Sequence, residues 1–479
     1  MIHRLVKCLR ELLPDRRASA ATFLAFAIIP LIGVIGMATD SSRAFLVKSR
    51  LSSALDAAAL AGGRSFFKVT RDAEINMFFE ANFPNGYMDA TVTGPVIAID
   101  PEAQKLTLSA AASVPTSFMR LLGFETLNVE GFSEVTRQMQ ALDVVMAIDM
   151  SGSMGSKTNG VKRITAARNA ANDLIDILFG NSSTKDLLNI GLVPWNGKVN
   201  VMLDGQLYNS GATTTEAVAS FTNPETGVSQ SQIFKANNSP VPLLEAPPPN
   251  WKGCVFNRYL HDGIDDNDAD VFDPPVPLMN GEWEAWQPIG PEGEPVSGGV
   301  CAMSPGSSEC TRCLSHGITP LQQDKATIQA AVNALQNPTG VTNIPAGLGW
   351  GWRVLTPDTP FTQAEADPDY NLQRAIVLLT DGANVGGYGD GYKAAFGTGA
   401  GARTEMNERL LELANNIKAS GVIIYVVQFA YQDSDLQTLL QQVASGPISP
   451  YYYYAPDADA LTAVFHEVAN DLSELRLSK

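Results

Sequence analysis

Residues 18–38 form a run of 21 residues without a charged side chain. As an α-helix, at about 1.5 Å per residue, this run reaches roughly 30 Å, the thickness of the hydrocarbon core of a bilayer. Pro30 interrupts the run, but membrane helices tolerate proline. A cleaved secretory signal is the alternative, since residues 36 and 38 are small, yet the run is long for a signal core. The sequence therefore favours an uncleaved transmembrane segment at residues 18–38.

The charges on either side of this run predict its orientation. The basic residues before it are Arg4, Lys7, Arg10, Arg16 and Arg17, and those that follow closely are Arg43, Lys48 and Arg50. Positive charge gathers on the cytoplasmic side of membrane helices, so residues 1–17 are expected in the cytoplasm. No second apolar run of comparable length appears. We expect a single-pass anchor that carries about 440 residues outside the cytoplasm.

Composition excludes two classes of protein. The chain has 479 residues, of which 45% are hydrophobic, so wholesale disorder is excluded. Its 33 Lys and Arg against 50 Asp and Glu leave a formal charge of −17. Such a balance repels phosphate backbones, and we therefore expect no nucleic-acid partner.

Two segments follow the anchor. In residues 39–63, Val47, Leu51 and Leu55 recur at helical spacing, and a Gly-Gly pair ends the pattern. This helix is either a spacer or a pilin-like stem able to pack against similar stems. Residues 64–140 are predicted to be a small β-rich linking segment, because apolar side chains alternate with polar ones at 106–110 and 127–129.

Residues 141–479 alternate strands with helices, which is typical of a mostly parallel sheet covered on both faces, an α/β fold. The predicted strands include 142–149, 188–195, 375–380 and 422–429, with helices after residue 163, at 408–420 and at 461–472. Asn196-Gly197 predicts a hairpin, and the tyrosine run at 451–454 is interpreted as opening the last strand. Between about 204 and 320 the alternation fails, and we interpret this stretch as a long insertion with little periodic core.

The insertion contains four of the five cysteines: Cys254, Cys301, Cys310 and Cys313. In an oxidising compartment, an even number of clustered cysteines predicts two disulfides, although the sequence does not choose among the three pairings. A zinc site built from all four thiolates and a redox pair at Cys310–Cys313 are the alternatives.

Side chains with oxygen donors follow the ends of predicted strands in residues 141–479. Asp149, Ser151 and Ser153 lie at alternating positions on one tight loop after the first strand. Thr342, ahead of a helix, and Asp381, after a buried strand, are expected at matching strand ends. Since the carboxyl ends of parallel strands share one edge of a sheet, all five are expected to converge there. Oxygen ligands of this kind favour a hard cation, Mg²⁺ before Ca²⁺ or Mn²⁺.

These motifs carry a resemblance. DMSGSM resembles the D-x-S-x-S motif of von Willebrand factor A domains, and VTNIPAGL and LLTDG resemble their second and third metal loops. The resemblance implies a Rossmann-like head with a metal-ion-dependent adhesion site (MIDAS) at Asp149, Ser151, Ser153, Thr342 and Asp381. The order of anchor, stem, β segment and late A domain resembles TadG-like proteins of the tight-adherence (Flp) pilus system. That likeness implies a bacterial inner-membrane location, with the bulk of the chain periplasmic or exported.

The function expected from this resemblance is binding rather than catalysis. A Mg²⁺ ion with few carboxylate ligands keeps an exchangeable position that an Asp or Glu of a protein partner can fill. The partner implied is a pilus or envelope component. The alternatives are a structural pseudopilin, in which the metal site is incidental, and a secreted hydrolase. The sequence shows no HExxH, G-x-S-x-G or Walker motif, so we assign no catalytic residue.

An acidic stretch inside the insertion offers a second candidate for a cation site. Asp266, Asp268 and Asp270 imitate the start of a calcium loop, and Asp262 and Asp265 precede them. Val271 stands where such a loop needs glycine, and Pro277 stands in place of the closing glutamate. We therefore interpret residues 262–270 as a solvated acidic loop, with calcium binding as the alternative.

Overall fold

The computed structural model describes residues 16–65, 70–100, 105–136, 141–261, 266–271, 285–295, 300–304, 310–357, 360–366, 368 and 371–477. The chain divides into two compact units, residues 1–138 with residue 479 and residues 139–478. Cys8 and the basic residues before position 16 lie outside the described residues, as do Asp262 and Asp265.

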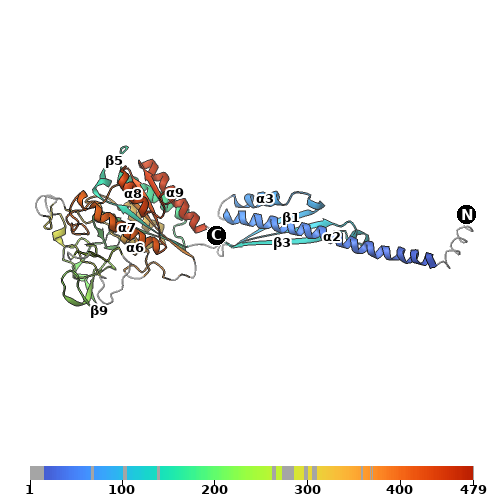
Figure 1. The fold of residues 1–479 in the computed structure, drawn as a ribbon, viewed down its shortest axis with the longest axis horizontal. Coiled ribbons are helices and arrows are strands. Elements are labelled where there is room, and N and C mark those ends of the chain that lie inside the picture. The colour runs from blue at the N-terminus through green and yellow to red at the C-terminus, as the bar shows by residue number, and fades with distance from the viewer. Residues whose placement is uncertain are drawn as a thin grey trace, which may run out of the picture. The chain divides into compact units, whose positions relative to one another are not determined.

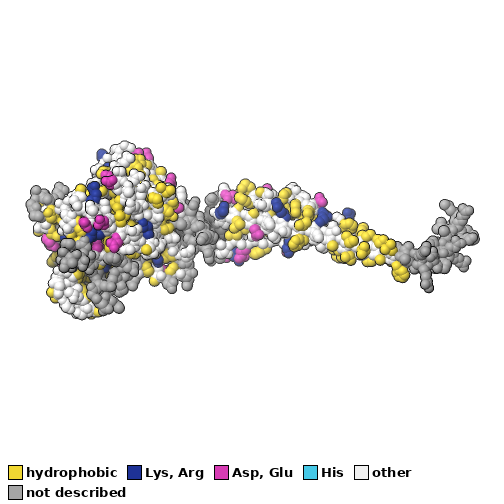
Figure 2. Space-filling model, in the orientation of Figure 1, with side chains coloured by type: hydrophobic (Ala, Val, Ile, Leu, Met, Phe, Trp, Pro, Cys, Tyr) yellow, Lys and Arg dark blue, Asp and Glu magenta, His cyan; other side chains and the backbone are white. Residues whose placement is uncertain are grey.

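The first unit is built on one long helix, α2 (Arg16–Arg64), which continues through Pro30 (Figure 1). Its 49 residues correspond to about 73 Å. Up to residue 37 its described large hydrophobic side chains are exposed, for example Phe23, Phe26 and Leu31, and Figure 2 shows them as a hydrophobic sleeve. By length and composition, α2 is the one helix within the described ranges that suffices to cross a membrane.

The second half of α2 packs on a three-stranded antiparallel sheet. The strands β1 (Thr91–Asp100), β2 (Lys105–Pro115) and β3 (Thr126–Thr136) follow one another in space as in sequence. Val47, Leu51 and Leu55 are fully buried against the inward side chains of β2, such as Leu106 and Leu108. The helical spacing and the strand alternation seen in the sequence therefore describe two faces of one hydrophobic core.

A helix lies within the stretch predicted to be β-rich. The segment α3 (Arg71–Asn82) contacts α2 and buries only Ile75 and Phe79, one helical turn apart. Because two apolar residues at spacing four make a weak signal, this helix was not predicted within the β-rich segment of residues 64–140.

The second unit is an α/β domain around a mixed sheet in the order β12-β8-β7-β4-β16-β17-β18. The parallel centre consists of β7 (Leu188–Trp195), β4 (Ala141–Asp149), β16 (Leu372–Thr380), β17 (Ile423–Phe429) and β18 (Tyr452–Ala455). Antiparallel strands complete it: β8 (Val199–Asn200), β12 (Cys254–Val255) and β15 (Thr319–Gln322), of which β15 pairs with β7. The predicted hairpin at Asn196-Gly197 is the β7–β8 turn.

Helices cover both faces of this sheet. One core lies under α4 (Arg163–Phe179), α5 (Lys325–Asn333) and α9 (Ala458–Leu477). The opposite core lies under α6 (Ile344–Leu355), α7 (Arg403–Ala419) and α8 (Ser434–Val443). Every residue of β4 is buried, as expected for a central strand covered on both faces. The predicted α/β class is confirmed.

The insertion has more structure than its composition indicated. It forms a small sheet of β9 (Thr214–Thr222), β10 (Ser229–Lys235) and β11 (Pro242–Leu243), and a hairpin of β13 (Tyr259–His261) and β14 (Asp266–Asp268). Trp251, Val255 and Trp286 join the core of the main domain instead of forming a separate one.

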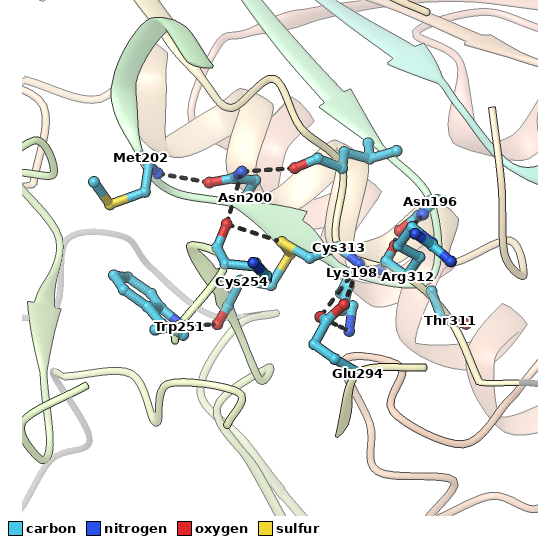
Figure 3. The surroundings of a disulfide bond; sticks show 12 residues. Asn196, Lys198, Asn200, Met202, Trp251, Cys254, Glu294, Thr311, Arg312 and Cys313 are labelled. Carbon is cyan, nitrogen blue, oxygen red and sulfur yellow. Dashed lines mark hydrogen bonds and ion pairs between the residues drawn. A yellow bond between two sulfur atoms is a disulfide. The ribbon is translucent and has the colours of Figure 1, made fainter. Parts of the chain in front are cut away.

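Two disulfides, Cys254–Cys313 and Cys301–Cys310, staple the insertion. Cys254 lies on β12, and Figure 3 shows how its surroundings tie this edge strand to the returning chain. Asn200 of β8 donates from Nδ2 to the Leu314 carbonyl at 2.7 Å. Buried Lys198 donates to Glu294 at 2.6 Å, and Glu294 accepts from the backbone N–H of Cys313. Cys310 and Cys313 are not joined to each other, which disagrees with a redox pair between them.

Candidate metal centre

Asp149 ends β4 and is completely buried. Its Oδ1 accepts from the backbone N–H of Ser151 at 2.7 Å, which fixes the tight turn that follows the strand. Its Oδ2 accepts from the hydroxyl of Thr380, the last residue of the neighbouring β16, at 2.8 Å. The carboxylate is therefore oriented from its own loop and from the next strand.

Two serine hydroxyls link this loop to the third one. Ser151 Oγ and Ser153 Oγ lie 3.0 Å apart, and Ser153 Oγ donates to Asp381 Oδ1 at 2.5 Å. Asp381 directly follows β16, and its side chain is fully buried. The first and third loops of the predicted set therefore meet at the carboxyl edge of the sheet.

Thr342 reaches the same point without following a strand. It lies in the loop between α5 and α6, just before Asn343, whose side chain caps α6 by accepting from the N–H of Ala346. Backbone hydrogen bonds hold this loop against the first one, from Gly152 N–H to the Gly340 carbonyl at 3.0 Å and from Thr339 N–H to the Met150 carbonyl at 2.8 Å. The expectation that Thr342 marks a strand end was wrong, but its loop lies beside the other two.

The side chains of Ser153, Thr342 and Asp381 line one open cavity of about 350 Å³. A Cβ placed on Gly382 would lie 3.8 Å from both Ser153 Oγ and Thr342 Oγ1, so this glycine separates two hydroxyls that face a common space. Two cationic side chains, Arg163 and Arg403, line the same cavity. Three of the five predicted oxygen donors thus line a space that is open to a ligand from outside, and hydrogen bonds connect Ser151 and Asp149 to Ser153.

Negative charge is concentrated at this edge. Burial raises the pKa of Asp149 to about 7, and the neighbouring charge of Asp381 adds to the rise. Burial also raises the pKa of Asp381, although hydrogen bonds from Ser153 and Arg163 oppose it. One cation, Arg163, pairs directly with Asp381, its Nη1 lying 2.8 Å from Oδ2. Two neighbouring buried carboxylates repel each other when both are ionised. A cation bound between them stabilises the doubly ionised form.

The donor set fits a hard divalent cation. Two carboxylates and three hydroxyls supply oxygen atoms only, which suits Mg²⁺, Ca²⁺ or Mn²⁺ better than a thiol- or imidazole-preferring metal. Within the ranges that the structure describes, no three His, Cys, Asp or Glu side chains form a metal cluster. The four insertion cysteines are accordingly paired as disulfides rather than gathered around zinc.

Sequence reasoning missed three residues of this site, namely Thr380, Arg163 and Arg403. Thr380 was adjacent to a predicted ligand, and a hydroxyl at the end of a buried strand was a signal that could have been used. Arg163, the first residue of α4, and Arg403, the first residue of α7, had no comparable signal, because they come close to the oxygen donors only in the folded chain.

Two family models match the chain. The Flp pilus-assembly TadE/G-like family covers residues 19–65, and the von Willebrand factor type A domain covers residues 317–467. The chain joins a TadE/G-like segment to a von Willebrand factor A (VWA) domain. The VWA match contains Thr342 and Asp381. The other three predicted ligands, Asp149, Ser151 and Ser153, lie at and after the end of β4, which pairs with β16 of the matched part. No curated protein matches the chain in sequence.

Several solved structures are similar to parts of this chain, at low sequence identity and with low TM-scores. The pilus adhesin SpaC of Lactobacillus rhamnosus GG is 14% identical, with 81% of this chain and 35% of SpaC covered and a TM-score of 0.35. The vWF domain of the type V pili tip protein Mfa5 of Porphyromonas gingivalis is 10% identical, with 71% and 97% covered and a TM-score of 0.35. Proximal thread matrix protein 1 of the mussel byssus, with a zinc-occupied MIDAS motif, is 13% identical, with 70% and 48% covered and a TM-score of 0.31. This chain spans about a third of SpaC and about half of the byssus protein.

In the described part of the acidic stretch, residues 266–270, two carboxylates pair with arginines instead of facing a shared cation site. Asp270 is buried and pairs with Arg258 Nε at 2.7 Å and with Arg353 Nη2 at 2.6 Å. Asp268 is also buried and faces Arg409 Nε at 3.2 Å. Because arginines on α6 and α7 already neutralise these carboxylates, the interpretation as a solvated loop was wrong for Asp268 and Asp270. They clamp the insertion to the domain.

Proposed function

We propose that this protein is a membrane-anchored factor of a tight-adherence pilus system that binds a protein partner through a divalent-metal-dependent adhesion site. The observation that carries the proposal is that Ser153, Thr342 and Asp381 line one open cavity. Hydrogen bonds link Ser151 to both Ser153 and Asp149, directly behind this cavity lining. Residues 18–38 of α2 would cross the bacterial inner membrane once, with the N-terminus in the cytoplasm. The VWA domain would then lie in the periplasm or beyond.

The five oxygen donors would hold the cation, and we propose Mg²⁺ as its natural form, with Ca²⁺ or Mn²⁺ as substitutes. When bound, the ion supplies a positive charge with an exchangeable position, which a carboxylate of a partner can occupy. Asp149 and Asp381 are fixed by hydrogen bonds from the protein, so the site is organised before the partner arrives. Arg163 and Arg403, which line the cavity, favour an acidic partner surface.

Titration calorimetry of the whole protein with Mg²⁺ tests the site. Asp149→Ala should abolish measurable Mg²⁺ binding, whereas Asp173→Ala, on the exposed side of α4, should leave it unchanged. Unaltered affinity in Asp149→Ala would refute the assignment.

Capture of a pilus or envelope component should be lost in EDTA and restored by Mg²⁺. Capture that persists undiminished in EDTA would argue against a metal-bridged contact.

A second candidate function is that of a structural pseudopilin, in which the metal site is incidental. It is favoured by the first unit, in which the stem helix and its sheet share a core that includes no residue of the VWA domain. Asp149→Ala separates the two functions in cells. It should abolish metal-dependent partner binding, and if piliation depends only on the stem helix and its sheet, piliation should remain intact.

A further inference from the structure

The loop between β2 and β3 presents a cluster of exposed apolar side chains. Phe118, Leu121, Leu122 and Phe124 fall within seven residues and are exposed by 40%, 81%, 59% and 56%. Scattered exposed apolar residues are ordinary on protein surfaces, but four large ones on one short loop indicate an interaction site. Their chain includes the short 3₁₀ turn η2 (Met119–Leu122). We call residues 118–124 the apolar loop.

The apolar loop is fixed to α2 at a defined height. Asp40 of α2 is buried and accepts three backbone hydrogen bonds, from Ser117 and Phe118 at 2.9 Å and from Met119 at 2.7 Å. Arg43, one turn further along, donates to the Pro115 carbonyl at 3.3 Å. These contacts hold the start of the loop against the helix.

Phe118 packs even closer to the anchor. A Cβ placed on Gly36 would lie 2.4 Å from the Cβ of Phe118, so the ring lies directly on this glycine. Gly36 belongs to the charge-free run of residues 18–38, and Asp40 lies two residues beyond the run. At about 1.5 Å per residue, Asp40 is about 3 Å along the helix axis from the end of the run. The loop therefore lies at the level where α2 would leave the membrane.

The rest of the sheet leads away from this level. Leu106, near the start of β2, lies at Gly62, where its side chain would meet a Cβ placed on that glycine. From Asp40 to Gly62 the helix rises about 33 Å, and the ten steps of β2 from Lys105 to Pro115 cover about the same length. The apolar loop is thus the end of the sheet nearest to the anchor.

We propose that the apolar loop inserts into the interfacial layer of the membrane on the side where the β-sheet lies, and so forms a second lipid contact beside the transmembrane helix. The proposal rests on the membrane span of the proposed function. Its partner is a lipid surface, because Phe118 packs on Gly36, within the charge-free run, and so joins the exposed apolar side chains of the loop to those of α2. Exposed Arg120 lies within the loop, where phosphate headgroups would attract it.

Such a contact would set the orientation of the first unit. A single helix can rotate about its axis and tilt in the bilayer. An apolar loop that inserts beside the helix restricts both motions, because the loop must stay in contact with the membrane surface. Asp40 transmits this constraint, because it joins the loop backbone to the helix.

The test uses the full chain, with Cys8→Ser, reconstituted into phosphatidylethanolamine and phosphatidylglycerol vesicles. Single variants Leu121→Cys, Phe132→Cys and Leu31→Cys carry an environment-sensitive fluorophore. Phe132 is the matched control, because it is 62% exposed on the outer face of β3 and pairs with Ser109, in the middle of β2. Circular dichroism checks that each labelled variant is folded.

We expect the probe at position 121 to show a blue-shifted emission and quenching by spin-labelled lipid several-fold stronger than at position 132. A probe at 121 as water-exposed as that at 132, with a lipid-embedded probe at 31, would overturn the proposal and leave the anchor intact. A water-exposed probe at 31 would instead overturn the anchor and the proposed location with it. A blue-shifted probe at 121 that lipid spin labels do not quench would identify a protein contact, such as a second copy, and also overturn the lipid contact.

Discussion

At the scale of single residues, Asp149 illustrates a conflict between stability and binding. Its carboxylate is fully buried beside that of Asp381, and its pKa is raised to about 7. An acid with a raised pKa destabilises the metal-free fold as the pH rises from its unfolded pKa, near 4, through about 7. Asp149→Asn should therefore melt at a higher temperature than the natural protein in EDTA at pH 8.

The same variant should gain no stability from Mg²⁺, whereas the natural protein should, because a ligand stabilises only the state that binds it. In EDTA, the difference in melting temperature between Asp149→Asn and the natural protein should decrease toward pH 4, where Asp149 is protonated. Thermal unfolding followed by circular dichroism with and without Mg²⁺ checks both expectations. A Mg²⁺-dependent stabilisation retained in Asp149→Asn would contradict this role.

Arg163 opposes the same cation. Its guanidinium pairs with Asp381 Oδ2 at 2.8 Å and so places a positive charge where a divalent ion would bind. Arg163→Ala should bind Mg²⁺ several-fold more tightly, because the incoming ion no longer competes with an ion pair. Calorimetric titration measures the change, and Arg168→Ala, on the same helix but outside the cavity, serves as the control. Weaker binding in Arg163→Ala would show that the arginine chiefly positions Asp381.

The sequence predicted the site better at this scale than at any other. D-x-S-x-S and LLTDG pointed to Asp149, Ser151, Ser153 and Asp381, which the structure brings together, because the donors follow central strands whose apolar runs are unmistakable. Arg163 was not predictable, since its role depends on where α4 begins relative to a strand more than two hundred residues later. The metal itself stays a prediction.

At the scale of elements, hydrophobic patterns located the strands and helices with strong cores and missed the polar ones. The strand β9 has one buried residue, Phe221, and no alternation to recognise. Buried charge also attaches the insertion to the domain, because Asp270 pairs with Arg353 of α6 as well as with Arg258 of the insertion itself. Pairings between charged residues far apart in sequence leave no periodic signal, so residues 262–270 were interpreted as a solvated loop.

This buried clamp should be essential for stability. Asp270→Asn leaves two buried arginines without their carboxylate and should cost about 3–5 kcal/mol of unfolding free energy. Burial raises the pKa of Asp270, but the charges of Arg353 and Arg258 outweigh it and leave the pKa lowered. The stabilisation is therefore complete above the unfolded pKa near 4 and is lost as the pH falls through the lowered pKa.

Urea unfolding of Asp270→Asn and of the natural protein between pH 7 and pH 3 measures this effect. The difference in unfolding free energy between Asp270→Asn and the natural protein should be largest at neutral pH and should decrease in acid. Asp176→Asn removes an exposed partner of Lys325 on the same domain and should cost less than about 1 kcal/mol. Equal losses in both variants would contradict a special role for the clamp.

At the scale of the whole molecule, the order of parts was readable because each part has its own composition. The charge-free run, the alternating strands and the strand–helix repeats follow one another along the chain. The TadE/G-like match at 19–65 includes most of the charge-free run, and the VWA match at 317–467 lies within the strand–helix repeats. The sequence did not reveal that stem and sheet share one core, because α2 and β2 meet only in three dimensions.

The two units should consequently unfold in two calorimetric transitions, since each has a hydrophobic core of its own. Mg²⁺ should raise only the transition of the VWA domain. Asp40→Asn should lower only that of the first unit, because it removes the charge from three backbone hydrogen bonds at the apolar loop. Burial raises the pKa of Asp40, but the N–H groups of Met119, Ser117 and Phe118 together with Arg43 leave it lowered, so its contribution is present at neutral pH.

Scanning calorimetry in detergent, with Mg²⁺ or EDTA, separates these effects. A charge-assisted hydrogen bond contributes about 1.5–3 kcal/mol, so the Asp40→Asn transition should shift by several degrees. Asp72→Asn, which loses only a local and exposed pair with Arg71, should not shift either transition. If Mg²⁺ moved both transitions together, metal binding in the VWA domain would also stabilise the first unit, and this would contradict the independent unfolding of the two units.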